Sequence, residues 1–109
     1  MNHPFSLTPS GEYLEASYAP SDRATCKKCK GKIDKFDIRI GEILEEDHFS
    51  SRKWFHLDCY NLKPRFLHVD PEKHLYKSDT LDKKDFKKVI KHIKDEVIRL
   101  NGGKIVKAT

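Results

Sequence analysis

Two short stretches decide the fold, CKKC at residues 26–29 and WFHLDC at residues 54–59. Together they supply three thiols and one imidazole, from Cys26, Cys29, His56 and Cys59. A Cys-x2-Cys pair followed by a His-x2-Cys pair is the donor set of a tetrahedral zinc site with no position left for water. The sequence therefore predicts one structural Zn²⁺ ion rather than a catalytic one.

The distance between the two stretches indicates what the metal joins. Residues 30–55, a span of 26 residues, separate them. This is longer than the spacer of about 12 residues in a C2H2 finger. We therefore expect the metal to tie together parts of a small sheet rather than one hairpin and one helix.

Other uses of the cysteines explain the pattern less well. The chain has three cysteines, an odd number, and no apolar signal segment precedes them. Both features disfavour a secreted disulfide framework. A redox Cys-x2-Cys motif would leave His56 and Cys59 unexplained, and no βαβ pattern surrounds it.

Composition limits the chain to one small domain. Its 109 residues are 37% hydrophobic and 36% charged, which leaves little apolar material for a core. Metal binding would compensate for the small core, because structural zinc stabilises finger peptides by about 10–16 kcal/mol. We expect the metal-free protein to be largely unfolded around the site.

The charge is concentrated after the first 22 residues. That later part carries all 22 basic residues and 14 of the 17 acidic ones, a formal charge of +8. A basic body of this size points first to a polyanionic partner. No segment is long and apolar enough to suggest a membrane partner.

Local patterns predict the domain bounds. Residues 1–12 mix Pro, Ser, Thr and Gly without a period and are expected to be a disordered tail. The finger domain is expected over residues 13–101, including a C-terminal helix, with a second tail over 102–109. Within the domain, the aromatic-rich residues 13–18 are expected to lie against the finger as an added strand.

Two further strands are expected in the segment that joins the two zinc knuckles, residues 26–29 and 56–59. Residues 36–40 alternate apolar and polar side chains, the period of a half-buried strand. Gly41 interrupts this alternation and suggests a bulge. Residues 51–56 are expected to be the return strand, with residues 45–50 as the hairpin tip.

The helix has the clearest pattern in the chain. Its apolar residues form one continuous face: Phe86, Val89, Ile90, Ile93, Val97 and Leu100. Asp79 or Asp82 is expected to cap its start, and Asn101 with two glycines to end it. Its other side carries Lys84, Lys87, Lys88, Lys91 and Lys94, which are either a solvated face or phosphate contacts. The predicted fold class is a small α+β zinc-stapled domain, with a short antiparallel sheet, a Cys3His zinc site and a C-terminal amphipathic helix.

Three stretches carry a family resemblance: YAPSDRATCKKC at residues 18–29, DIRIG at 37–41 and WFHLDC at 54–59. They resemble the PARP-type zinc finger, found in the N-terminal fingers of poly(ADP-ribose) polymerase and in a vertebrate DNA ligase. The similarity runs from about Tyr18 to the end of the expected helix near Leu100. Around the start of this helix, Leu81, Asp85 and Val89 also match the family pattern.

The resemblance implies a function. Fingers of this family bind the phosphate backbone beside a DNA break and stack apolar side chains on the exposed base pair. The chain is therefore expected to be a DNA-binding module for nicks, gaps or termini, acting in DNA repair or replication in the nucleus. Broken or nicked duplex DNA is the expected partner, together with a protein partner in repair or chromatin.

The resemblance also implies DNA-contact roles for individual residues. Arg23 and Arg39 match basic positions that contact phosphate, and guanidinium groups suit phosphate oxygens. For Arg39, a surface ion pair with Asp37 or Glu42 stays an alternative. Lys28, inside the knuckle turn, either contacts DNA or offsets the thiolate charge.

The remaining three candidate DNA contacts have aromatic rings. Trp54 matches the family's aromatic residue beside the histidine, as core packing or as a DNA contact. His48 and Phe49 occupy the place of the stacking loop, and a stacked base is worth about 1–3 kcal/mol. Three acidic residues precede them, Glu45, Glu46 and Asp47, which would repel phosphate and are a departure from the family.

No catalytic arrangement is visible in the sequence. The expected metal shell is closed, and no Ser/His/Asp set or spare cysteine remains, so we expect no enzyme activity and no small-molecule substrate. The chain is expected to be either a stand-alone finger protein or an excised domain. The alternative function is a chromatin-associated zinc module for protein–protein interaction, whose acidic loop engages a basic partner segment.

Overall fold

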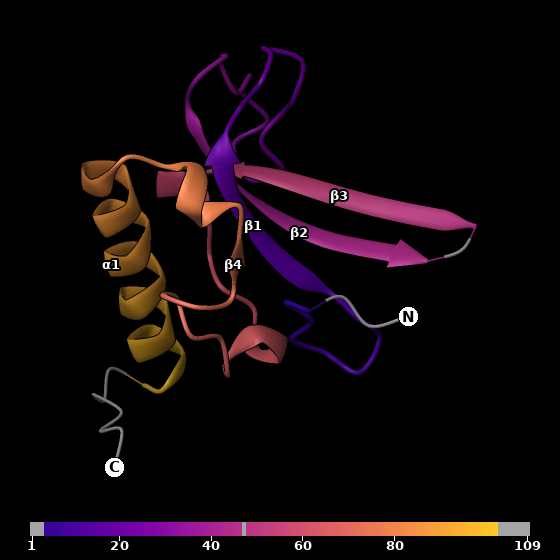
Figure 1. Cartoon of the computed structure of the whole chain (residues 1–109), viewed down its shortest axis with the longest axis vertical. Helices are drawn as coiled ribbons and strands as arrows, with labels where there is room; N and C mark the ends of the chain where they lie inside the picture. Colours follow the sequence, from indigo (N-terminus) through magenta and orange to yellow (C-terminus); the bar gives the residue numbers. More distant parts are fainter. Residues whose placement is uncertain (1–3, 47, 103–109) are drawn as a thin grey trace.

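The computed structural model describes residues 4–46 and 48–102. A four-stranded sheet carries one long helix against one face, and two of its strands extend beyond the body as a hairpin (Figure 1). The elements in chain order are β1 (Tyr13–Tyr18), β2 (Ile38–Glu46), β3 (Phe49–His56), η1 (Leu57–Cys59), η2 (Pro64–Phe66), β4 (Leu75–Tyr76), η3 (Ser78–Thr80) and α1 (Lys83–Leu100).

The sheet has the order β3-β2-β1-β4. β1 pairs antiparallel with β2, and β2 pairs antiparallel with β3, which confirms the predicted antiparallel sheet. The two-residue β4 adds a parallel pair on the other side of β1. β1, expected as an added strand, therefore lies inside the sheet.

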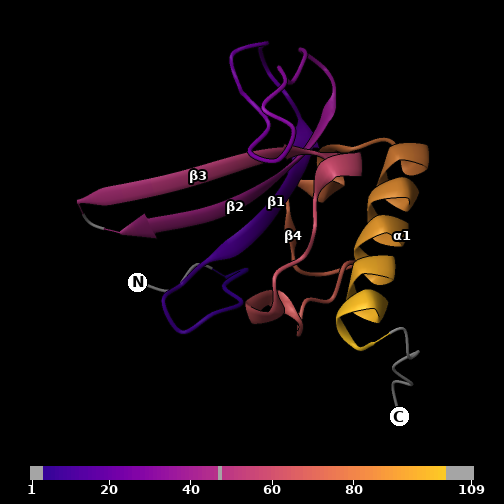
Figure 2. The same ribbon diagram turned by 180° about the vertical axis from the view of Figure 1, so that it is seen from behind.

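The hairpin of β2 and β3 is longer and more regular than the sequence suggests. Its register is unbroken from Arg39 opposite His56 to Glu46 opposite Phe49. The bulge expected at Gly41 is therefore wrong, and most of the expected tip at residues 45–50 is paired strand. The view from behind shows the same hairpin projecting past the rest of the fold (Figure 2).

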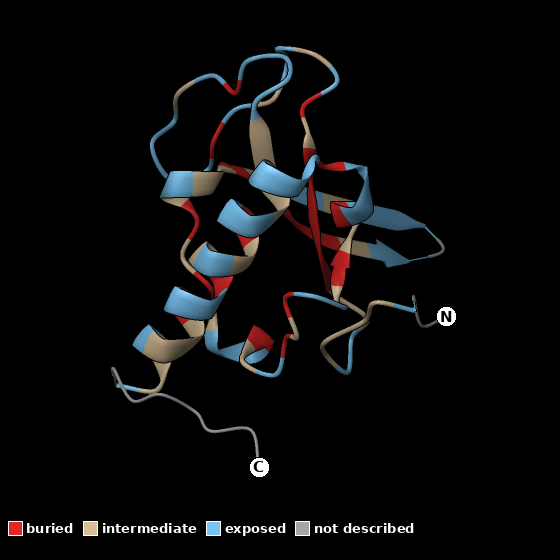
Figure 3. Cartoon of the chain, turned by 60° about the vertical axis from the view of Figure 1, so that its left-hand side comes forward, coloured by how far each residue is buried: buried red, intermediate tan, exposed pale blue. Residues whose placement is uncertain are grey.

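The core lies between the sheet and α1. Successive side chains of a strand point to opposite faces, and the face toward α1 is apolar. Its side chains are buried together with Val89 and Ile93 of α1: Leu14, Ala16, Ile40, Phe55 and Leu75. Figure 3 shows buried residues on the sheet beneath α1 and exposed ones along the helix's outer side.

The helix begins and ends where its capping residues predict. The Asp82 side chain accepts a hydrogen bond from the Asp85 amide at 2.8 Å, and Asn101 follows the last helical residue. The predicted apolar face is divided, however. Phe86, Val97 and Leu100 pack against the core, whereas Ile90 belongs neither to the core nor to the residues packed on it.

Residues 4–12 lie against the body. Leu7 packs on the core, and the Glu12 carboxylate forms an ion pair with Arg65 at 3.1 Å. The expected bounds of the finger and its two tails stay predictions, and residues 1–3 and 103–109 lie outside the described residues. Within the described residues, no helix combines the length and apolarity that crossing a membrane requires.

Candidate metal centre and nucleic-acid interface

The first half of the metal centre is a tight turn closed by its own backbone. The Cys26 amide donates to the Gly31 carbonyl at 2.8 Å, and the Lys30 amide donates to the Cys26 carbonyl at 3.0 Å. Lys30 adopts a left-handed φ of 65° to complete the turn. The Gly31 amide then donates to Cys29 Sγ at 3.3 Å, which is the kind of hydrogen bond that a thiolate accepts.

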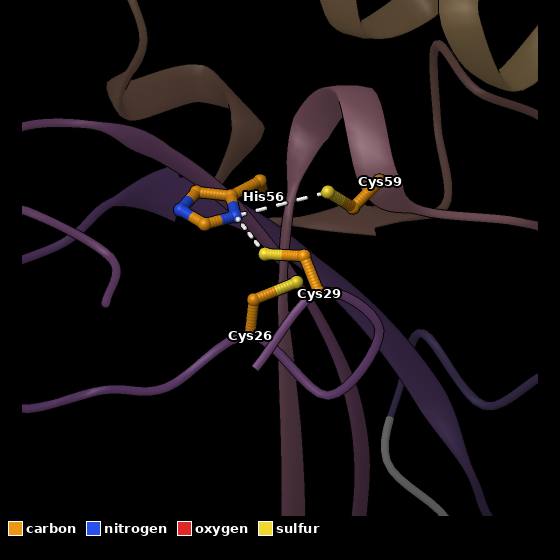
Figure 4. A group of neighbouring side chains, drawn as sticks. All are labelled: Cys26, Cys29, His56 and Cys59. Atoms are coloured by element: carbon orange, nitrogen blue, oxygen red, sulfur yellow. Dashed lines mark hydrogen bonds between the residues drawn. The ribbon is translucent and has the colours of Figure 1, made fainter. Parts of the chain in front are cut away.

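The second half comes from the end of β3 and the start of η1. His56 is the last residue of β3, and Cys59 ends the 3-10 turn that follows. The candidate ligand atoms of Cys26, Cys29, His56 and Cys59 all lie within 4.8 Å of one another. Figure 4 shows the three sulfur atoms and the imidazole turned toward one common point.

The histidine ring is oriented by a hydrogen bond outside the cluster. His56 Nε2 lies 2.9 Å from the Lys32 carbonyl, to which it donates. This leaves Nδ1 facing the sulfurs, 3.3 Å from Cys29 Sγ and 3.8 Å from Cys59 Sγ. A metal-binding histidine commonly has its second nitrogen held in this way.

The thiols of the cluster influence each other's ionisation. Burial by itself would raise the pKa of Cys26, but hydrogen bonds from the Cys29, His56 and Lys28 backbone lower it to about 6. Burial, reinforced by the neighbouring thiols Cys26 and Cys29, raises the pKa of Cys59 to about 11. Three thiolates in so small a space therefore need a cation among them. The donor set and its arrangement fit one zinc ion.

A glycine lets the tryptophan beside the histidine lie flat on the sheet. Gly41 is opposite Trp54 in the β2–β3 register. A Cβ atom on Gly41 would lie 2.4 Å from Cζ3 of the Trp54 ring, far inside contact distance. The indole therefore covers the β2 backbone, and any larger residue at position 41 would displace it.

Arg39 lies on this indole. Its guanidinium carbon is 3.5 Å from the Trp54 ring centroid, a close cation–π stack. Burial lowers the pKa of Arg39, and the nearby Glu15 carboxylate opposes that shift. An arginine stays charged under such conditions, so the sheet holds a partly buried positive charge next to His56, its partner in the register.

This guanidinium is incompletely satisfied. Its Nε is buried and has no hydrogen-bond partner among the described residues. The expected ion pair with Asp37 or Glu42 does not form in the described part of the chain. Glu42 instead lies on the opposite sheet face and accepts from the Tyr60 hydroxyl at 3.0 Å. The Arg39 charge therefore has unused hydrogen-bonding capacity.

The other expected DNA contacts are spread over the molecule. Arg23 is exposed in the segment leading to Cys26. Lys28 is exposed in the knuckle turn and donates to Asn61 Oδ1. Both are thus near the metal end of the hairpin, where Trp54 and Arg39 also lie.

His48 and Phe49 lie at the other end. Both are exposed, Phe49 with 54% of its surface accessible. Glu46, the partner of Phe49, lies seven positions along β2 from Arg39, which corresponds to roughly 23 Å at ~3.3 Å per residue. The structure therefore brings Arg39 and Trp54 together and keeps Phe49 apart from them. Asp47 lies outside the described residues.

Sequence reasoning missed two features of this region. The close approach of Gly41 to Trp54 could have been found only by pairing β2 with β3 in the register that places Arg39 opposite His56. Phe36 was expected to begin a half-buried strand, but β2 begins at Ile38, and Phe36 is 71% exposed with a left-handed φ of 73°. A bulky residue in that conformation is uncommon.

Comparison with known proteins identifies the family. The model of the poly(ADP-ribose) polymerase and DNA-ligase zinc-finger region matches residues 17–93, which is most of the chain. The chain belongs to the PARP-type zinc-finger family. The matched region contains all four cluster residues, both knuckles and most of α1.

Curated relatives agree with this assignment. A Drosophila melanogaster poly(ADP-ribose) polymerase is 28% identical over 95 residues, 85% of this chain and 10% of that protein. An Arabidopsis thaliana poly(ADP-ribose) polymerase 1 is 39% identical over 46 residues, 40% of the chain and 5% of that protein. An Arabidopsis thaliana polynucleotide 3′-phosphatase is 33% identical over 54 residues, 49% of the chain and 8% of that protein. The chain thus spans a tenth or less of these relatives, all enzymes by name, and corresponds to a zinc-finger region within them.

Proposed function

We propose that this chain is a zinc-dependent DNA-binding module that recognises strand breaks or ends. The observation that supports it most is the Arg39 guanidinium. It is held on Trp54 beside the metal cluster, partly buried and without an ion-pair partner among the described residues. The buried Nε is out of reach of a ligand, but the partly exposed side chain can present its terminal nitrogens to a phosphate, which accepts hydrogen bonds from a guanidinium.

Zinc has a structural role in this proposal. Cys26, Cys29, His56 and Cys59 would hold one Zn²⁺ ion as a closed shell, which supplies folding free energy and no catalysis. The cluster connects the knuckle turn to the end of β3, and the Lys27 amide donates to the Trp54 carbonyl at 2.9 Å. Loss of the metal would therefore disturb the Trp54 and Arg39 arrangement directly.

Backbone binding would involve further basic residues at the same end. Arg23 and Lys28 are exposed there, and neither forms an ion pair within the described chain. They are placed to contact phosphates on either side of the one bound by Arg39. Such contacts position a protein on DNA without reading its sequence.

Recognition of a break would use the other end of the hairpin. Phe49 is the exposed aromatic residue there, and it would stack on the base pair that a nick, gap or terminus leaves uncovered. The acidic neighbours oppose DNA less than their number suggests. Glu45 accepts from Tyr13 at 2.9 Å and from Arg52 at 3.0 Å, so its charge is partly compensated.

An alternative function retains some support from the same tip. Glu46 is exposed opposite Phe49, an acidic and aromatic pair that would also suit a basic protein segment of chromatin. Salt dependence separates the two functions, because log K for DNA falls with log salt by about 0.9 per phosphate contact. A mainly apolar protein interface would show a much smaller slope.

The wider biological role follows the family. The polynucleotide 3′-phosphatase and the poly(ADP-ribose) polymerases suggest action in DNA repair in the nucleus. We propose no enzyme activity, small-molecule substrate or membrane partner for the chain itself. It would act by positioning or recruiting other proteins at a break.

Fluorescence anisotropy with three hairpin-closed DNAs tests the proposal. One duplex is intact, one nicked and one gapped, so that no open end provides an accidental binding site. The zinc-loaded protein should bind the nicked and gapped DNAs more tightly than the intact one at two salt concentrations. A chelator should abolish binding. Equal weak binding to all three DNAs would reject break recognition.

A further inference from the structure

A groove with a volume of about 650 Å³ lies along α1. It is bordered by the helix on one side and by Glu72, in the loop before β4, on the other. Phe86, Ile90 and Ile98 line it and lie on one side of the helix, because they are separated by four and eight residues.

The apolar lining is not explained by the core of the domain. Ile90 and Ile98 belong neither to the buried cluster nor to the residues packed against it, and both stay partly exposed. A helix that only covered the sheet would have polar residues at these positions. This apolar strip is therefore available to a ligand.

The rim of the groove is basic and only partly neutralised. Lys91 pairs with Asp95 at 2.9 Å, and Lys94 pairs with Glu72 at 3.3 Å. Lys83 and Lys87 also line the groove and have no ion pair within the described chain. The groove thus combines an apolar floor with an excess of positive charge near the start of the helix.

We propose that this groove is a docking site for an acidic amphipathic segment of a partner protein. Apolar side chains of the segment would pack on Phe86, Ile90 and Ile98, and its carboxylates would face Lys83 and Lys87. This is the helix-in-groove mode, in which apolar anchors recur every three or four residues. The complementary charges would favour fast association and exclude basic segments.

DNA fits this surface less well. A phosphate backbone offers nothing apolar to Ile90 and Ile98, and two of the four lysines are already engaged by carboxylates. The groove also lies across the sheet from the proposed DNA contacts, because α1 covers one face of the sheet whereas Arg39 and Trp54 point to the other. One molecule could therefore bind DNA and an acidic partner at the same time.

Binding of a synthetic peptide tests the proposal. The probe is a fluorescein-labelled peptide of roughly 16 residues in which leucines recur every three to four positions among glutamates, compared with the same peptide carrying lysines. Zinc-loaded protein should raise the anisotropy of the acidic peptide and not that of the basic one. Absence of binding to the acidic peptide would overturn the proposal.

Variants of two neighbouring lysines give the matched comparison. Lys87→Glu should weaken peptide binding roughly tenfold, since it reverses a charge at the rim. Lys84→Glu makes the same change on the same helix, at an exposed residue that does not line the groove, and should leave binding within about twofold. Equal losses in the two variants would mean unspecific charge attraction and would overturn the assignment.

Ile90→Ser tests the apolar floor without disturbing the core. Peptide binding should fall at least about fivefold, while circular dichroism and zinc content stay unchanged. Affinity of Lys87→Glu for nicked DNA should change less than about twofold, which separates failure of this site from failure of the proposed DNA function. Competition by intact duplex DNA would overturn the proposal. So would self-association that depends on Ile90.

Discussion

The two ends of the β2–β3 hairpin are built in opposite ways. At the metal end, Arg39 and Trp54 are stacked over Gly41 and held beside the Cys3His cluster. At the far end, Phe49 is exposed and packs against nothing in the core. Under the proposed function the two ends would have different tasks: the rigid end would fix a phosphate, and the projecting end would reach a surface beyond it.

The two ends should therefore differ in what their substitution costs. Changes at the metal end should affect folding and binding together, because the same residues serve both. Changes at the tip should affect binding alone. The predictions below test this contrast from the largest effect to the smallest.

Loss of the metal should have the largest effect. Cys26 is fully buried within the core, so Cys26→Ser should prevent a stable fold at the metal end, with a loss exceeding about 3 kcal/mol in the free energy of unfolding. Chelation of the wild type should do the same. Circular dichroism and zinc content measure the result, and a cooperative native-like melt of the chelated protein would contradict it.

Substitution of Gly41 should come next. A Cβ there would lie 2.4 Å from the Trp54 ring, so Gly41→Ala should cost about 1–3 kcal/mol in stability. The cost should shrink in a Trp54→Leu background, because the clashing ring is gone. A double-mutant cycle by denaturant unfolding measures the coupling. Equal costs in both backgrounds would mean that the indole does not cover Gly41.

Arg39 should matter to DNA binding more than an arginine of the same hairpin. Arg39→Gln should weaken binding to nicked DNA roughly tenfold or more, since hydrogen bonds to charged groups are worth about 1.5–3 kcal/mol. Arg52→Gln is the control, because Arg52 is exposed and paired with Glu45. Its effect should stay within about threefold. Similar losses would show that charge alone, and not the stacked arrangement, governs binding.

The smallest effect on stability should come from the tip. Phe49→Ala removes a side chain that is 54% exposed and should change the free energy of unfolding by less than about 0.5 kcal/mol. Thermal or urea unfolding measures this. A loss above about 1 kcal/mol would mean that Phe49 contributes to the fold of the hairpin.

Much of the metal end could be predicted because its signals are local. The cysteine and histidine spacing is confirmed as a cluster, and the Asp82 cap is where the sequence places it. The stacking of Arg39 could not be predicted. It depends on which residue of β3 lies opposite Gly41, and this register is set by the turn and by the fit of both strands together, not by either strand alone.

The tip and the helix were harder to predict for a different reason. The residues around Glu45 and Phe49 lack a clear alternation, so the extent of pairing could be read only from the register set at the other end. Ile90 fits the helical period of the core residues, but it lies at the edge of that face. Only the packing shows that it borders a groove instead.

The most direct test of the central claim is the ratio of affinities for nicked and intact closed DNA, measured for the wild type, Arg39→Gln and Phe49→Ala. We predict that Arg39→Gln lowers both affinities and leaves the ratio unchanged, whereas Phe49→Ala lowers only the affinity for nicked DNA and brings the ratio toward unity. Equal losses on both DNAs in the Phe49→Ala protein would contradict the division of tasks between the two ends.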